Sequence, residues 1–254
     1  MLSLATAFAI SIGAKKLFYG AHGGDHTIFL KADWKKVFKP MESSFLIGKA
    51  MKIKKGDVLC EIGVGSGINS ILAAKLGAER VYATDMNEHA IKWAIYNVSL
   101  NGVADKTEFK LGNMFEPFPK KTYDIIISDT PFGPLPPKKV LDRIKFDKEM
   151  ILALCCGKTG GELAIQIIKR GIKRLNPNGR IFFTLGDITD INKVEKILNK
   201  SKIMIKKISS METPLLIKDP EYIKFLKKKG TKFKKYKNKL LFKVYVFEAK
   251  SMND

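Results

Sequence analysis

The sequence has few cysteines and no long hydrophobic run. Its three cysteines, Cys60, Cys155 and Cys156, match neither a metal site nor a disulfide framework, and a reducing cytoplasm fits them best. The apolar run Met1–Ile12 is too short to span a bilayer, and it lacks the preceding basic residues of a signal peptide. We expect it to pack on the domain; a membrane-surface anchor is the alternative.

Acidic residues are also scarce. The 254 residues include 25 Asp and Glu against 46 Lys and Arg, which gives a net charge of +21. Such an excess predicts a polyanionic partner, RNA or a ribonucleoprotein. A general preference for lysine on solvated surfaces is the alternative explanation. A hydrophobic content of 45% is ordinary for a globular protein of one domain with additions.

No pattern of metal ligands stands out. His22 and His26 are four residues apart, as helical metal ligands often are, but Gly23 and Gly24 between them argue against a helix. We therefore expect a surface loop there and no metal.

Predicted strands alternate with predicted helices along most of the chain. The strands are expected at 58–62, 80–84, 107–111, 123–128, 180–185, 202–208 and 240–248, and the helices at 45–51, 68–76, 87–100, 161–175 and 190–199. This alternation predicts an α/β fold with a doubly wound, mostly parallel sheet. Ligands of such sheets bind at the carboxyl ends of the strands.

A glycine-rich turn follows the first of these strands. Its glycines are Gly63, Gly65 and Gly67. They allow the backbone to approach a ligand closely. Glu61 lies at the end of the strand before the turn, and Asp85 ends the next strand, where an acid can hold ribose hydroxyls. A dinucleotide fingerprint needs a small third residue where Ile68 stands, so that motif does not fit.

The pattern Glu-x-Gly-x-Gly-x-Gly, with Asp85, resembles the cofactor loop of the class I S-adenosylmethionine (SAM) methyltransferases. The resemblance implies SAM as the methyl donor and a seven-stranded, Rossmann-like sheet whose last two strands are antiparallel. It divides the chain into an N-terminal extension, 1–50, and a methyltransferase domain, 51–254. Met86 and Met114 would flank the adenine ring, and Asn113 stands where the family usually has an acid facing the adenine amine.

The segment Asp129-Thr130-Pro131-Phe132 resembles the Asn/Asp/Ser-Pro-Pro-aromatic motif of amino methyltransferases. Those enzymes methylate exocyclic base amines or the glutamine side-chain amide. Such a nitrogen is a poor nucleophile because its lone pair is delocalised, and holding both N–H groups directs that lone pair at the methyl donor. The resemblance implies that Asp129 and the Thr130 carbonyl accept the two N–H groups and that Phe132 stacks on the acceptor. Thr130 departs from the first proline of the motif.

Two further segments extend the resemblance to about 37–185. Val37–Leu46 resembles the P-x-E-D-S segment of archaeal and eukaryotic relatives of the HemK glutamine methyltransferases, with Ser43 in place of the usual acid. The local pattern predicts that Ser43 or Ser44 caps the helix 45–51. Gly157–Gly161 resembles the G-G-x-x-G-L segment that follows the active-site motif in HemK-type enzymes.

A basic insert at about 212–239 interrupts the alternation before the last strand. Between Lys218 and Lys243 there are eleven lysines and two acids. The lysines could follow a phosphate backbone while aromatic rings stack on unpaired bases. The alternative is that the rings cover the sheet edge. The interleaved aromatic residues are Tyr222, Phe225, Phe233, Tyr236 and Phe242.

These features predict a SAM-dependent N-methyltransferase whose acceptor is an exocyclic amine of ribosomal or transfer RNA. The alternative acceptor is a glutamine amide in a translation factor or ribosomal protein. A third interpretation is an RNA- or ribosome-binding module that keeps a SAM-like pocket without turnover, because Thr130 and Asn113 depart from the family pattern.

Overall fold

The computed structural model describes residues 28–252. The predictions made for Met1–Ile12, His22 and His26 lie outside this range. No helix among the described residues is long and apolar enough to cross a membrane.

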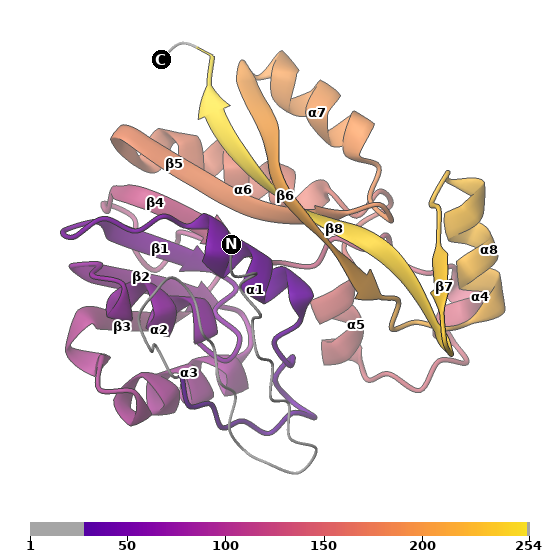
Figure 1. The fold of residues 1–254 in the computed structure, drawn as a ribbon, viewed down its shortest axis with the longest axis horizontal. Helices are drawn as coiled ribbons and strands as arrows, with labels where there is room; N and C mark the ends of the chain where they lie inside the picture. Colours follow the sequence, from indigo (N-terminus) through magenta and orange to yellow (C-terminus); the bar gives the residue numbers. More distant parts are fainter. Residues whose placement is uncertain (1–27, 253–254) are drawn as a thin grey trace, which may run out of the picture.

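One central sheet organises the molecule (Figure 1). Its order is β3-β2-β1-β4-β5-β8-β6, with the short β7 added beside β8. The first five strands of this order are parallel to their neighbours, and β8 pairs antiparallel with β5, β6 and β7. The predicted α/β class and the antiparallel last strands are confirmed, whereas the predicted number of seven strands is wrong, because the insert adds an eighth, β7, beside β8. The strands are β1 Val58–Ile62, β2 Arg80–Asp85, β3 Thr107–Leu111, β4 Tyr123–Ser128, β5 Leu175–Gly186, β6 Ile203–Pro214, β7 Lys234–Tyr236 and β8 Lys239–Ser251.

Helices cover both faces of the sheet because the buried strand residues alternate between two apolar clusters. Leu59 of β1 packs with α1, α2 and α3, whereas Cys60 packs with α6 and α7 on the other face. The helices are α1 Glu42–Ala50, α2 Ile68–Lys75, α3 Glu88–Leu100, α4 Lys138–Leu141, α5 Lys148–Leu154, α6 Glu162–Gly171, α7 Ile191–Lys200 and α8 Pro220–Lys228, with two short 3-10 turns at Ala104–Lys106 and Ile172–Arg174.

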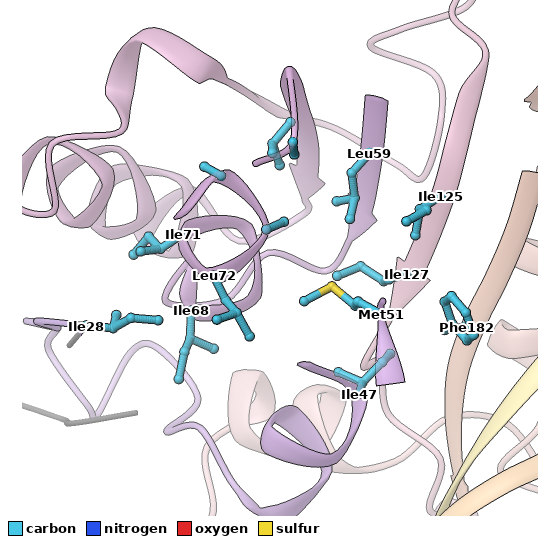
Figure 2. Close-up of a cluster of buried hydrophobic side chains, with 14 of the residues drawn as sticks. Ile28, Ile47, Met51, Leu59, Ile68, Ile71, Leu72, Ile125, Ile127 and Phe182 are labelled. Carbon is cyan, nitrogen blue, oxygen red and sulfur yellow. The ribbon is translucent and has the colours of Figure 1, made fainter. Parts of the chain in front are cut away.

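The segment that precedes β1 belongs to the same core as the sheet. Ile28 and Ile47 are fully buried and lie with Leu59, Ile71 and other apolar side chains in one cluster (Figure 2). Helix α1 therefore packs directly against the sheet and α2. The division of the chain near residue 50 stays a prediction.

Helix α1 corrects one local expectation. It begins at Glu42 with Met41 as its N-cap, so Ser43 and Ser44 lie inside its first turn and are not the cap. The Ser44 hydroxyl still accepts a hydrogen bond from the Met41 backbone N–H. The hydroxyl groups of both serines donate hydrogen bonds to Asp129.

Candidate functional site

A cleft of about 990 Å³ opens at the carboxyl ends of the parallel strands. Its size matches that of small-molecule sites. The cleft brings together all of the predicted site residues except Gly67. Gly67 packs behind the loop, where a Cβ added to it would lie 3.2 Å from the Cβ of Ala94. Lining the cleft are Glu61, Gly63, Gly65, Asp85, Met86, Asn113, Met114, Asp129, Thr130, Pro131 and Phe132.

The glycine loop needs its glycines for conformation. Gly63, Gly65 and Gly67 have φ angles of 83°, 52° and 82°, which lie in the left-handed region that side chains disfavour. Gly63 is also in close contact, because an added Cβ would lie 3.1 Å from Cγ2 of Thr130. The predicted cofactor loop and the predicted acceptor loop therefore adjoin.

Asp85 connects the glycine loop to the next strand end. Its Oδ2 accepts a hydrogen bond from Gly65 N at 3.0 Å, and its Oδ1 accepts one from Asn87 N at 2.9 Å. Burial raises the pKa of Asp85, and these backbone donors lower it. The remaining lone pairs can accept hydrogen bonds from a ligand diol.

Glu61 is the most enclosed acid of the cleft, with 2% of its surface exposed. Its Oε2 accepts a hydrogen bond from the Ser70 hydroxyl. Burial raises the pKa of Glu61 to about 8, against the opposing effect of that hydrogen bond.

No lysine or arginine between residues 28 and 252 forms an ion pair with Glu61, Asp85 or Asp129. Buried acids normally have a partner of opposite charge. The raised pKa of Glu61 keeps that group protonated near neutral pH, so Asp85 and Asp129 are the unpaired acids that favour a cationic ligand. SAM carries a sulfonium and an ammonium group, so the residues present fit it.

The three residues predicted near the adenine ring differ in their surroundings. Met86 is 76% exposed, and Met114 is buried with a positive φ of 49°. The Asn113 amide donates to Glu116 Oε1 at 3.0 Å, which leaves its own amide oxygen available to a ligand. Their roles stay predictions.

Three hydroxyl groups converge on Asp129. Oδ2 accepts hydrogen bonds from Ser44 at 2.7 Å and Ser43 at 3.1 Å, and Oδ1 accepts one from Thr184 at 2.8 Å. The enclosed surroundings raise the pKa of Asp129, and the three donors lower it. Because a carboxylate has about four lone-pair sites, one acceptor site remains, on Oδ1. The sequence offered no signal for these partners.

The backbone carbonyls that follow Asp129 are nearly all engaged. Pro131 O accepts a hydrogen bond from Cys156 Sγ, Phe132 O from Thr189 Oγ1, and Pro134 O from the Tyr222 hydroxyl. Gly133 O accepts one from Cys156 N. In the described chain nothing donates to the Thr130 carbonyl. It is the carbonyl to which the motif assigns an N–H of the acceptor.

One glycine of the 157–161 segment, Gly160, packs against this loop. An added Cβ at Gly160 would lie 2.2 Å from Phe132 O, so only glycine fits there. Phe132 in turn packs edge-to-face on Phe242, with ring centroids 6.3 Å apart. Strand β8 thus contributes to the wall behind the loop.

The aromatic residues of the insert face the interior, which contradicts most of the expected base-stacking set. Tyr222 and Phe242 are buried, and Phe225 and Phe233 pack on the same apolar cluster. Tyr236, at 54% exposure, is the exception. The other four rings belong to one apolar cluster that also contains Val140 of α4 and Leu215, and the alternative prediction, that the rings cover the sheet edge, stays a prediction. No cluster of three or more potential metal ligands occurs within 28–252.

Comparison with known proteins identifies related sequences. The family of ribosomal protein L11 methyltransferases (PrmA) matches residues 42–130. A protein of Methanocaldococcus jannaschii named as a protein N5-glutamine methyltransferase is 32% identical over 173 residues, which cover 66% of this chain and 83% of the relative. The release factor glutamine methyltransferase of Aquifex aeolicus is 34% identical over 168 residues, 63% of this chain and 58% of that enzyme.

The fold has solved counterparts. The crystal structure of ribosomal protein L11 methylase from Lactobacillus delbrueckii subsp. bulgaricus superposes with a TM-score of 0.53 over 89% of each chain, at 16% identity. At this identity the likeness concerns the fold.

Proposed function

The chain belongs to the class I SAM-dependent methyltransferases, in the HemK-like family of amino methyltransferases, and we propose that it methylates a glutamine side-chain amide in a translation-related protein. The methyltransferase class and SAM as the donor follow from the family. The acceptor is our proposal. It replaces the RNA amine that the sequence analysis placed first, because the matching relatives are named for protein substrates.

The names of the relatives favour a protein acceptor, and the observation that carries N-methylation of a planar NH2 group is the pair of vacant hydrogen-bond acceptors beside the glycine loop. Asp129 retains one acceptor site on Oδ1, and the Thr130 carbonyl has no donor among the described residues. A primary amide presents two N–H groups on one nitrogen. Two acceptors next to Gly63 are what such a group requires.

The residues of the chain would orient the amide and exclude water. Asp129 and Thr130 would each accept one N–H, which would direct the nitrogen lone pair at the methyl donor, and Phe132 would pack on the amide plane. When bound, SAM supplies a methyl group on a cationic sulfur, so that transfer forms a C–N bond, breaks a C–S bond and leaves one proton to be lost from nitrogen. The glycine loop, Glu61 and Asp85 would hold that cofactor.

Labelled SAM tests the acceptor. The protein and RNA fractions of cells that lack this enzyme are incubated separately with the purified chain, and the label is followed in each. We expect the label in protein, and a methylated glutamine side chain by peptide mass spectrometry, both strongly reduced with Asp129→Ala. Label in RNA alone would restore the RNA acceptor. SAM binding without label in either fraction would favour the non-catalytic interpretation.

A further inference from the structure

The basic insert is a folded unit attached to the acceptor end of the cleft. Leu226 is fully buried, and it packs with Tyr222 and Phe242 in one apolar cluster. The Tyr222 hydroxyl donates to Pro134 O at 2.7 Å, which fixes α8 to the acceptor loop. Figure 1 shows α8 and β7 at the end of the molecule to which β6 and β8 extend. The outward side chains of α8 are therefore held at a defined place beside the cleft.

Three lysines form a stripe on the outward face of α8. Lys224, Lys227 and Lys228 are exposed and have the spacing i, i+3 and i+4, which places them next to each other on a helix. Like charges at this spacing repel each other and destabilise a helix. Helix stability therefore does not account for the stripe. Lys229 is different, because its Nζ donates to the Lys158 carbonyl at 2.6 Å.

The acids near the stripe are engaged elsewhere. Asp219 accepts Arg143 Nε at 2.6 Å, and Glu221 is paired with Arg143 and Lys139. Glu212 is paired with Lys234. None of the three stripe lysines has an ion-pair partner in the part of the chain that the structure describes. Within residues 28–252, no ion pair neutralises the positive charge of this stripe.

The composition of the face distinguishes between two kinds of anionic partner. Protein–protein interfaces are depleted in lysine and enriched in aromatic residues and arginine. The insert has no arginine from Lys218 to Lys243, and of its aromatic rings Tyr236 alone is exposed. Lysine ammonium groups bind phosphates as point charges, without the bidentate geometry that arginine offers to carboxylates and phosphates alike.

We propose that the outward face of α8, with the exposed lysines of the β7–β8 hairpin, binds the phosphate backbone of RNA. The buried aromatic rings hold α8 in place, and the exposed lysines contact the phosphates of the RNA. The bound strand lies beside the acceptor end of the cleft. The proposal concerns binding and does not depend on the identity of the methyl acceptor.

Binding of a labelled oligouridine, followed by fluorescence anisotropy over a series of salt concentrations, tests this surface. We expect the affinity of the unaltered protein to fall steeply with salt. The triple variant Lys224→Gln, Lys227→Gln, Lys228→Gln should bind more weakly and flatten the logarithmic salt slope by about two units, at ~0.7 per single-strand phosphate contact. Its SAM affinity should not change.

The matched control lies on α7, which is well separated from α8 (Figure 1). Lys193, Lys196 and Lys200 are also exposed lysines of an amphipathic helix, so their replacement by glutamine removes the same charge. This control should retain the slope of the unaltered protein. Equal losses in both variants would mean that net charge alone binds RNA, and would overturn the proposal.

Two additional arms complete the test. Poly-glutamate, added as a competitor, represents an acidic protein. If poly-glutamate displaces oligouridine at an equal concentration of negative charge, the choice of RNA as the partner is overturned. Absence of oligouridine binding by the unaltered protein would do the same. If the α8 variant does not fold, Lys235→Gln, Lys237→Gln, Lys239→Gln on the hairpin takes its place, with the same expected flattening and the same contrary outcomes.

Discussion

The Ser44 hydroxyl lies 2.7 Å from Oδ2 of Asp129, although the two residues are 85 positions apart. Ser44 thus joins the first turn of α1 to the acceptor loop, and Ser43 and Thr184 complete the set of donors. The three hydroxyls fix the orientation of the carboxylate and leave it one acceptor site. We therefore expect substitutions at Asp85 to affect SAM binding and substitutions at Asp129 and Phe132 to affect methyl transfer.

Replacement of Asp85 by alanine should weaken SAM binding by ~1–3 kcal/mol, because charge-assisted hydrogen bonds to the ligand are lost. The Gly65 N–H also loses its acceptor. Calorimetry with SAM and with S-adenosylhomocysteine measures the effect, and NAD should not bind. Asp105→Ala, in the turn before β3, is the control and should retain full affinity. An unchanged affinity in Asp85→Ala would refute the cofactor assignment.

Asp129→Ala and Phe132→Ala should spare SAM affinity and lower methyl transfer by ~100-fold or more, since orientation of the acceptor supplies several kcal/mol. The measurement pairs calorimetry for SAM with transfer of labelled methyl groups to the protein fraction. Asp142→Ala, an exposed acid after α4, controls for loss of charge. Full activity in both site variants would place the acceptor elsewhere.

Glu61 should make the stability of the SAM-free protein fall as pH rises. Burial raises the folded-state pKa of Glu61 to about 8, so between the ordinary carboxyl range and that value the folded chain keeps a proton that the unfolded chain has released. The free energy of unfolding then decreases with pH, by at most ~1.4 kcal/mol per pH unit.

Urea unfolding between pH ~5 and ~9 measures this dependence. Glu61→Gln can still accept the Ser70 hydrogen bond and should remove the Glu61 part of the slope. Glu79→Gln, an exposed control, should not. Equal slopes in all three proteins would show that Glu61 does not titrate in this range.

Tyr222→Phe should destabilise the protein by ~1–2 kcal/mol and lower methyl transfer more than SAM affinity. The variant keeps the ring stacked on Phe225 but leaves the buried Pro134 carbonyl without its donor. Denaturant unfolding and the transfer assay measure the two effects. Tyr236→Phe, on the exposed ring of β7, should change neither, and identical behaviour of the two variants would contradict a positioning role for Tyr222.

Local patterns were sufficient for most of the fold. The predicted bounds of β1, β3 and β4 agree with the structure, because each is a short apolar or alternating run between clear turn signals. The positive φ angles of Gly63, Gly65 and Gly67 also follow from local sequence. The glycine loop, Asp85 and the 129–132 segment each lie at the carboxyl end of a predicted strand. Because parallel strands end on the same side of a sheet, the sequence predicted that these segments meet.

The sequence by itself thus determined the α/β class, the glycine-rich turn after β1 and the end of the sheet at which the cleft lies, but not β7 or α8 of the insert. Only the tertiary structure decided that Ser43, Ser44 and Thr184 meet at Asp129, and that Tyr222 holds Pro134 while its neighbouring rings face inward. These contacts join segments that are far apart in the chain. Their partners are chosen by the packing of whole elements, which no periodicity within one segment encodes.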